Sequence, residues 1–363
     1  MKKSIWIVGL LLLLAFGVFG IVPAQIGLRY NEVLQQPPYV VPKPALVLHK
    51  DLFIADLHAD SLLWDRNLLA DGQWGHLDLP RMAAGNMALQ AFTVVTKTPE
   101  GKNIERNDGN SDQIQKLAIV QLWPSRTWNS PLERALYQAK KLHTVQKNAG
   151  GAFHIIKNRT DLVSFLVDRN SEQAQRGSLL AGWLGLEGAH ALEGNLQNLD
   201  KLYDAGFRMI GLAHFFDNEF AGSAHGVQKH GLTPMGEELI KTLEARRMMV
   251  DLSHASSTTI NDVLKIAKRP VLVSHTGVKG TCNNNRNLSD AQLQAIAKNG
   301  GLIGIGFWDT AVCGKDAAAI ARAIAYTGKL IGFEHVALGS DYDGAETVPF
   351  AVDGLPLLTA ALM

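Results

Sequence analysis

The sequence predicts an α/β fold, a (β/α)8 barrel of the TIM type with a helical insertion after its second strand. Three features predict it: short apolar runs recur along the chain, amphipathic stretches lie between them, and side chains of the metal-ligand type follow most of the runs. Strands buried on both faces read as continuous apolar runs, and catalytic groups of such barrels lie at the carboxyl ends of strands. The expected strands are residues 52–57, 88–95, 179–186, 209–213, 248–252, 271–274, 302–307 and 336–339.

Amphipathic helices are expected between these strands. The best-marked helix, over residues 130–147, begins at Pro131 and is followed by Gly150, the usual asymmetry of helix ends. The segment 98–171 is too long for a single crossover, so it is expected to be an insertion of helices and loops near the active face. The other expected helices are residues 236–247, 257–268, 289–299 and 315–331.

The chain begins with a membrane-targeting pattern. Lys2 and Lys3 precede an almost uninterrupted apolar run over residues 5–22, whose length lies between a signal-peptide core and a full membrane span. An uncleaved anchor is the favoured interpretation, and a signal cleaved near Val22-Pro23-Ala24 is the alternative. Both export the rest of the chain to a periplasmic or extracellular location, and cleavage would make it a secreted protein.

Three regions are therefore expected: a membrane anchor or signal segment over residues 1–28, a linker over 29–50, and a catalytic barrel over 51–363. Four prolines between residues 37 and 44 indicate that the linker is an extended stalk. The chain ends near the expected start of the last barrel helix, so this helix is expected to be incomplete.

Composition excludes several classes of function. Lys and Arg together number 35 and Asp and Glu 34, and the chain carries no basic stripe, so nucleic-acid binding is not expected. The two cysteines, Cys282 and Cys313, form no CxxC pair and are too few for a disulfide framework. Any metal must therefore be held by His, Asp and Glu side chains.

His58 and Asp60 follow the first expected strand. Because residues two apart in a strand share a face, both side chains can reach one point beyond its end, where an imidazole and a carboxylate suit a divalent metal. The alternative is a capping carboxylate beside a structural histidine.

Glu187 directly follows the third strand and precedes a glycine. A carboxylate there can bridge two metals, and the alternative is a buried ion pair with an arginine.

His254 and His275 each follow a β-type run, and neutral imidazoles at two adjacent strand ends would complete a second metal site. One of them could instead be a structural histidine. Asp341 follows the last strand and is expected to face the metals and transfer protons, unless it forms an Asx turn. Asp343 fits such a turn better.

Two further residues are candidates for binding substrate. His214 ends the fourth strand and could donate a hydrogen bond to a substrate oxygen, or it could be a core histidine. Arg286 lies in a polar loop after the sixth strand, where it could hold a carboxylate in a bidentate fork or simply be solvated. His190 is expected beside the metal ligands rather than among them. Other histidines are expected to be structural or on the surface: His49, His76, His143, His154, His225, His230 and His335.

Taken in order, these residues resemble the motifs of the membrane dipeptidase (renal dipeptidase) family of binuclear zinc peptidases, which have an amidohydrolase-type barrel. The resemblance extends from about Asp51 to the end of the chain. Its motifs are Asp56-x-His58-x-Asp60, Gly-x-Glu187-Gly-x-His190, Tyr203-x-x-Gly206-x-Arg208 before His214, Asp251-x-x-His254, Ser274-His275, Arg286-Asn287 with Asp290 following, and Gly339-x-Asp341-x-Asp343-Gly344.

The resemblance implies two zinc ions and a role for each residue. His58 and Asp60 would bind the first ion, Glu187 would bridge, and His254 and His275 would bind the second. His214 would contact the scissile carbonyl oxygen, Arg286 the substrate carboxylate, and Asp341 would be the acid/base residue. Asn218 falls where the family has a polar residue near the substrate. Members are commonly dimers, and some carry their lipid anchor at the C-terminus, unlike this chain.

The function implied is hydrolysis of dipeptides, extending to those with a C-terminal D-residue, by a hydroxide that bridges the metals and attacks the peptide carbonyl. Two alternatives stay open. One is another amidohydrolase-type metal hydrolase that acts on a lactone, amide or phosphoester. The other is a non-catalytic, membrane-tethered binding protein that keeps the barrel.

Overall fold

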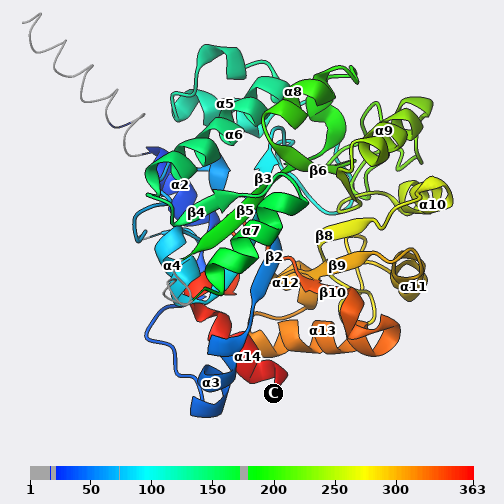
Figure 1. Cartoon of the computed structure of the whole chain (residues 1–363). Helices are drawn as coiled ribbons and strands as arrows, with labels where there is room; N and C mark the ends of the chain where they lie inside the picture. Colours follow the sequence, from blue (N-terminus) through cyan, green and yellow to red (C-terminus); the bar gives the residue numbers. More distant parts are fainter. Residues whose placement is uncertain (1–16, 18–21, 73, 172–178) are drawn as a thin grey trace, which may run out of the picture.

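A closed ring of parallel strands forms the centre of the molecule. The structure, a computed structural model, describes residues 17, 22–72, 74–171 and 179–363. Within these residues, eight strands pair side by side, and the ring closes because β3 pairs with both β2 and β5. The predicted barrel is therefore confirmed (Figure 1). In ring order the strands are β2 (Ile54–Ala59), β3 (Met87–Val95), β5 (Leu180–Glu187), β6 (Phe207–Gly211), β7 (Met249–Asp251), β8 (Leu272–Thr276), β9 (Leu302–Ile305) and β10 (Val336–Leu338).

The insertion between β3 and β5 contains one strand that the sequence did not predict. β4 (Phe153–Ile155) pairs with residues 180–182 at the start of β5, and β6 pairs with residues 184–186 further along the same strand. β4 has only three residues, which is too short for an alternation of apolar and polar residues to be recognised between the neighbouring helices. Those helices are α5 (Gln113–Val120), α6 (Pro131–Asn148) and α7 (Arg159–Arg169), as expected for a helical insertion.

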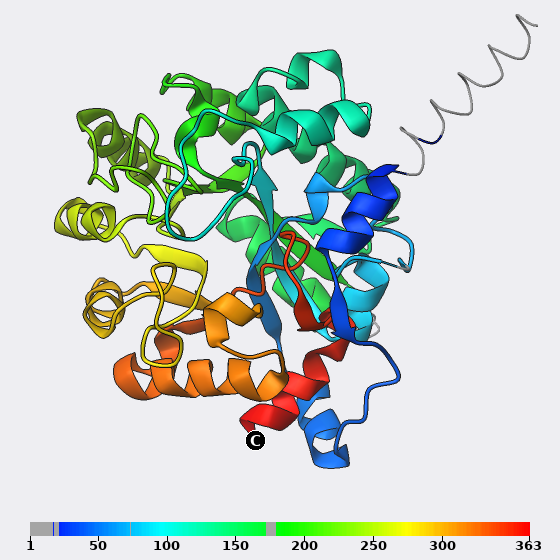
Figure 2. The ribbon, with the colours of Figure 1, turned by 180° about the vertical axis from the view of Figure 1, so that it is seen from behind.

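Helices cover the outside of the barrel and alternate with its strands (Figures 1 and 2). Several of them begin where the side chain of a Ser, Thr or Asp accepts a hydrogen bond from a first-turn backbone N–H, as Ser289 does in the capping box of α11. The predicted helices after β6, β7, β8 and β9 all form. The helices are α8 (Asn198–Asp204), α9 (Pro234–Ala245), α10 (Ser257–Ile266), α11 (Asp290–Lys298) and α13 (Ala317–Ile331), with shorter α4 (Leu79–Ala84), α12 (Asp309–Val312) and α14 (Leu355–Leu362).

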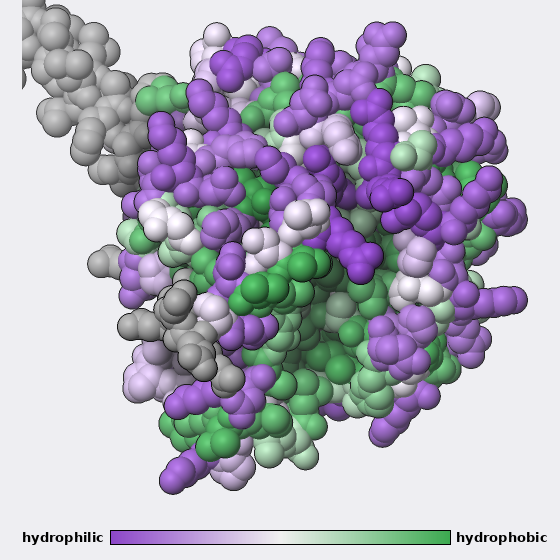
Figure 3. All heavy atoms as spheres, in the orientation of Figure 1, coloured by the Kyte–Doolittle hydropathy of each residue, from purple (hydrophilic) through white to green (hydrophobic). Residues whose placement is uncertain are grey.

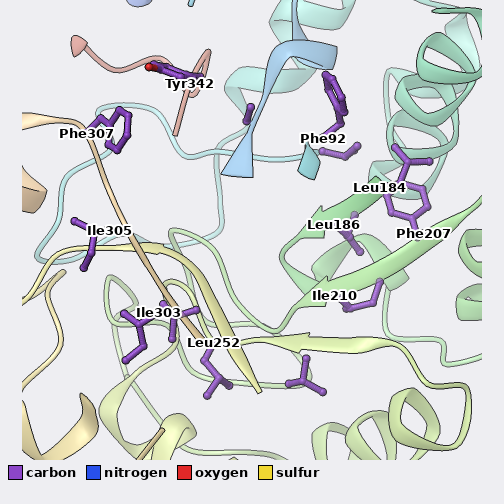
Figure 4. Packing of buried hydrophobic residues seen from close by; sticks show 14 of the residues in the cluster. Phe92, Leu184, Leu186, Phe207, Ile210, Leu252, Ile303, Ile305, Phe307 and Tyr342 are labelled. Atoms are coloured by element: carbon purple, nitrogen blue, oxygen red, sulfur yellow. The ribbon is translucent and has the colours of Figure 1, made fainter. Parts of the chain in front are cut away.

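One large hydrophobic cluster joins the strands to the surrounding helices. Its members come from successive strands, for example Phe92, Leu186, Ile210 and Ile303, and each is fully buried (Figure 4). Polar residues cover most of the face drawn in Figure 3, around an apolar hollow near its middle. The rigid core holds the carboxyl ends of the strands in fixed positions, which is what a catalytic site requires.

Residues 22–51 do not form the extended stalk that the prolines suggested. They form α2 (Val22–Tyr30), β1 (Val33–Gln35) and α3 (Lys43–Asp51). β1 pairs with β11 (Val348–Phe350) near the other end of the chain. His49 of α3 is buried, and its ring nitrogens lie 2.8 Å from Thr359 Oγ1 and 3.0 Å from Gly85 O. The prolines restrict the backbone angles only at their own positions. The contacts with β11, Thr359 and Gly85 determine where residues 22–51 lie on the barrel.

The predicted anchor lies almost wholly outside the described residues, which include only residues 17 and 22 of the run 5–22. Among the residues that the structure does describe, no helix has the length and apolar character needed to cross a bilayer.

Cys282 and Cys313, which are 31 positions apart in the sequence, form a disulfide. Two cysteines could not predict a framework, but the fold brings this pair together. The bridge ties the loop after β8, which carries Arg286, to the loop after β9, which carries α12.

Candidate metal centre and cleft

Glu187 lies at the centre of a cluster of histidines at the carboxyl ends of the barrel strands. Its Oε1 lies 3.1 Å from Nε2 of His254, 3.4 Å from Nε2 of His275 and 3.6 Å from Nε2 of His58. Its other oxygen, Oε2, lies 3.3 Å from Nε2 of His214. The alternative of an ion pair with an arginine does not apply, because the ion partners found for Glu187 in the described part of the chain are histidines.

The ligand-type side chains form overlapping groups. His58, Asp60 and Glu187 make one group, and Glu187, His254 and His275 make another, so Glu187 belongs to both. Within each group the ligand atoms lie within 4.8 Å of one another, and all these residues are buried. A third group joins His58, His275 and Asp341. The structure therefore brings the six predicted residues together in the arrangement that a bridging carboxylate requires.

Charge and protonation in the cluster fit divalent cations. Burial holds the pKa values of His254 and His275 well below the usual range, so both rings are neutral and can offer a lone pair. Burial alone would also lower the pKa of His58, but the carboxylates of Asp60 and Glu187 raise it to about 10. Nε2 of His58 has no hydrogen-bond partner among the described residues. The same carboxylates favour positive charge at this point, and a divalent cation would supply that charge when His58 gives up its proton and offers Nε2 as a ligand.

A buried serine and aspartate orient two of the histidines. Ser274 Oγ donates to Asp251 Oδ2 over 2.6 Å, and it lies 2.9 Å from Nδ1 of His58 and 3.0 Å from Nδ1 of His275. Contacts at Nδ1 turn Nε2 of each ring toward Glu187. In metal sites, such outer partners fix the orientation of the ligating rings. This role explains why Asp251 and Ser274 belong to the motifs.

His225 also belongs to this outer layer, although it was expected only to be structural or on the surface. Its Nε2 lies 2.9 Å from Nδ1 of His254, and its Nδ1 lies 2.8 Å from the carbonyl oxygen of Ile104 in the insertion. The ring is fully buried. His225 lies in a long loop after β6 that has no periodic pattern, so only the fold could reveal the contact.

His214, Arg286 and Asp341, three of the residues expected to act on substrate, line the same cleft, which has a volume of about 760 Å³. Arg286 is buried, donates to His275 O over 2.8 Å, and lies with its Cζ 5.6 Å from the centre of the Trp308 ring. Burial raises the pKa of Asp341 to about 7, which suits a group that exchanges protons. Asp341 also has a left-handed backbone, with φ of 61°, a conformation that concentrates at functional sites.

Asn218 does not lie where the resemblance suggested. Its Nδ2 donates to Leu212 O over 2.9 Å and its Oδ1 accepts from the backbone N–H of Phe220, so the amide closes a turn. It is absent from the described residues that line the cleft.

His190 contacts Thr96 Oγ1 over 2.9 Å, beside the cluster rather than in it, as expected. Gly188, which follows Glu187, packs closely against His190. A Cβ added at Gly188 would lie 2.5 Å from the His190 ring, so only glycine fits at this position.

Asp343 is structural, but its carboxylate contacts distant residues and does not form the Asx turn that the sequence favoured. Its carboxylate pairs with Arg66, accepts from Ser61 Oγ over 2.5 Å and accepts from the backbone N–H of His76 over 2.7 Å. These contacts fix the loop that carries Asp341.

A model of one protein family matches most of the chain: Membrane dipeptidase (Peptidase family M19) matches residues 43–363. The chain belongs to this family. Dipeptidase aclJ of Aspergillus oryzae is 35% identical over 314 residues, which cover 82% of this chain and 68% of that protein. An uncharacterized dipeptidase of Schizosaccharomyces pombe is 38% identical over 175 residues, which cover 46% of this chain and only 42% of the yeast protein.

Solved structures share the membrane dipeptidase fold with this chain. A metallo peptidase from Rhodobacter sphaeroides, liganded with a phosphinate mimic of the dipeptide L-Ala-D-Ala, is 24% identical with a TM-score of 0.67, covering 85% of this chain and 92% of that one. The probable dipeptidase PvdM from Pseudomonas aeruginosa is 18% identical with a TM-score of 0.68, and the match covers 88% of this chain and 91% of the PvdM chain.

One wall of the cleft lies outside the part of the chain that the membrane dipeptidase family model matches. Residues of α2, among them Ile26 and Tyr30, line the cleft together with the metal-ligand candidates, yet they precede residue 43. Lys102 of the insertion and Glu346 after β10 also line it. None of these was expected from the sequence, because their place in the cleft depends on contacts between distant segments.

Proposed function

We propose that this protein hydrolyses dipeptides with two zinc ions, the first held by His58, Asp60 and Glu187 and the second by Glu187, His254 and His275. The observation that carries the proposal is the position of Glu187, whose Oε1 lies 3.1 to 3.6 Å from three histidine nitrogens. Membership of the membrane dipeptidase family supports the peptide substrate. Zinc suits this set of imidazole and carboxylate ligands.

When bound, zinc supplies Lewis acidity toward the substrate carbonyl and makes a water acidic near neutral pH. The remaining steps belong to the chain. Asp341, with a pKa of about 7, accepts a proton from the attacking water and delivers it to the departing amine nitrogen. His214 donates a hydrogen bond to the carbonyl oxygen as negative charge develops there. Its ring is buried and lines the cleft, with Nε2 3.3 Å from Oε2 of Glu187, and Nδ1 has no partner among the described residues.

Arg286 selects substrates that end in a free carboxylate. A guanidinium binds a carboxylate through two parallel hydrogen bonds, and Arg286 lines the cleft beside the ligand candidate His254. The peptide bond next to a carboxylate held there lies one residue away, so it is the C-terminal peptide bond that is brought to the metal ligands. The same geometry tolerates either configuration at the second residue, provided that the carboxylate is in place. We therefore include dipeptides with a C-terminal D-residue, and the mimic bound by the Rhodobacter protein has that configuration.

The test is metal analysis of the purified full-length protein combined with a substrate panel. We expect two zinc ions per chain and hydrolysis of L-Ala-L-Ala and L-Ala-D-Ala, lost on chelation and restored by zinc. The amidated dipeptide, which lacks the carboxylate for Arg286, should be a poor substrate. A Glu187→Gln variant should bind less metal, and Glu219→Gln on a surface loop serves as the matched control. Hydrolysis of a lactone or phosphoester alone would favour the other amidohydrolase-type activity, and an inert protein would favour a binding role.

We further propose that the barrel is exported and retained by the N-terminal apolar run. The Cys282–Cys313 disulfide supports an oxidising compartment, since such bonds persist outside the cytosol. Pro23 and Gly27 of α2 are buried on the barrel, which favours an uncleaved chain, because cleavage near Ala24 would cut this helix. Cell fractionation and N-terminal sequencing of the mature protein test both points, and cross-linking tests the homodimer common in the family.

A further inference from the structure

The cleft continues beyond the metal-ligand candidates into an apolar trough. Ile26 of α2 forms one side of this trough, and Ile114 and Leu117 of α5 form the other. Leu63, Trp64 and Val95, which follow β2 or end β3, form its floor and belong to one hydrophobic cluster with Ile114. We call this region the α2–α5 trough. The two helices contact each other on the same side of the barrel (Figures 1 and 2).

The trough lies across the barrel from Arg286. The β3 strand that ends at Val95 and the β8 strand before Arg286 are separated by three strands in either direction around the closed ring. Strands so placed face each other across the mouth, and the cluster around Glu187 lies between them. A dipeptide whose carboxylate is held at Arg286 therefore extends its first residue toward the trough.

Specific contacts hold the α2 wall in place. Gly27 packs on Trp74 so closely that an added Cβ would lie 2.3 Å from the ring. The Asn31 side chain accepts from the backbone N–H of Ala345 over 3.1 Å, and Glu32 O accepts from the backbone N–H of Val348 over 3.0 Å. Ala345 lies four positions after Asp341, so the wall is attached to the loop that carries the proton-transfer residue.

The size of the cleft exceeds what a small dipeptide needs. A volume of about 760 Å³ lies in the upper part of the range of pockets that bind drug-sized ligands, ~300–1,000 Å³, and an alanyl dipeptide is far smaller than such a ligand. Part of this volume lies between α2 and α5, where Ile26, Ile114 and Leu117 give the lining its apolar share. An apolar surface of this kind gains free energy when an apolar side chain displaces water from it.

We propose that the α2–α5 trough binds the side chain of the substrate's first residue and makes the enzyme prefer dipeptides that begin with a large apolar residue such as Leu, Met or Phe. The inference rests on the proposed dipeptidase function and adds its substrate class. One methylene in an apolar pocket changes kcat/KM by roughly 10-fold or more. Leu-Ala should therefore be cleaved with a kcat/KM at least about tenfold above that of Ala-Ala.

The experiment measures the ratio of kcat/KM for Leu-Ala over Ala-Ala in the full-length zinc-loaded enzyme and in three variants. Leu117→Gln and Ile26→Gln place a polar group on the two sides of the trough. Ile119→Gln changes an exposed residue of the same helix α5 that does not line the cleft, and it is the matched control. We expect each trough variant to lower the ratio about fivefold or more, while Ile119→Gln leaves it unchanged.

The outcomes separate the two hypotheses. Hydrolysis of neither dipeptide by the wild-type enzyme would contradict the dipeptidase function itself. Hydrolysis of both with a ratio near one, or an equal fall of the ratio in the control, would overturn the trough as a specificity site. If circular dichroism shows that Leu117→Gln has not folded, the ratio in Ile26→Gln decides, because Ile26 is only partly buried.

Discussion

The side chains of His225 and His254 contact each other through ring nitrogens, with Nε2 of His225 2.9 Å from Nδ1 of His254. His254 presents its other nitrogen to Glu187 over 3.1 Å. His225 in turn is held by the carbonyl oxygen of Ile104. The chain of contacts therefore runs from the insertion to the proposed second metal, and His225 is a positioning residue.

Replacing His225 with Ala should weaken metal binding without removing a ligand. Loss of an outer partner of a ligating histidine typically costs 10- to 100-fold in affinity. Competition with a zinc chelator measures this affinity, and His225→Gln should recover part of it by restoring a hydrogen-bonding group. The control His230→Ala changes a histidine whose Nδ1 lies 2.8 Å from Gly231 O, away from the metal-ligand candidates, and the zinc affinity of this variant should match that of the wild type. Equal zinc affinity in His225→Ala and wild type would exclude the positioning role.

Replacing Arg286 with Met should mainly raise KM for dipeptides. Hydrogen bonds to a charged group are worth about 1.5–3 kcal/mol, so KM should rise roughly 10- to 100-fold while kcat changes less. Steady-state kinetics on Ala-Ala gives both constants. Arg246→Met, which alters a surface arginine paired with Asp200, is the matched control. An unchanged KM in the Arg286 variant would mean that the substrate carboxylate binds elsewhere.

Replacing Asp341 with Asn should lower kcat by about 10²- to 10⁴-fold, the usual contribution of a positioned acid/base group. Zinc content should persist, because the ligand groups that share Glu187 do not require Asp341. Metal analysis and single-turnover kinetics on the same sample separate the two effects. The exposed Asp309 provides the control variant Asp309→Asn. Full activity in the Asp341 variant would assign proton transfer to another group.

The buried pair of Arg66 and Asp343 should make stability depend on pH. Burial alone would raise the pKa of Asp343, but Arg66 and His76 lower it below its ordinary value. The pair therefore stabilises the fold above the unfolded-state pKa of about 4, and this contribution is lost as pH falls through the lower folded-state pKa.

Removing one partner of this pair leaves a buried charge, so Arg66→Met should cost about 3–5 kcal/mol of unfolding free energy at pH 7. Urea unfolding at a series of pH values measures the cost. The difference from wild type should shrink in acid, where Asp343 becomes protonated. Adding Asp343→Asn to the Arg66 variant should recover much of the loss at neutral pH. A difference that is constant with pH would show that packing of Arg66, rather than its charge, is what matters.

The barrel and most of its site could be predicted because each signal is local. A strand buried on both faces must be apolar along its length, and a ligand at its carboxyl end must follow that run directly, as Glu187 follows 180–186. His58, His254, His275 and Asp341 obey the same rule. Closure of the ring then brings these separate strand ends to one point.

Other features could not be predicted, because they depend on contacts between distant segments. The prolines near residue 40 favour extended backbone, yet His49 is buried against Gly85 and Thr359. The polar Asn218 fits a family position, but its amide is used by its own turn. His225 and the α2 wall lie outside any strand end, so no periodic pattern marks them.

The barrel, the order of its strands and the candidate metal-binding residues could be predicted from residue types alone, because burial and ligand chemistry constrain the residue type at each position. The folded structure was needed to show which carboxylate lies between the histidines, which outer groups orient them, and that α2 lines the cleft. Those properties depend on distances between residues far apart in the chain, and packing of the whole fold sets such distances.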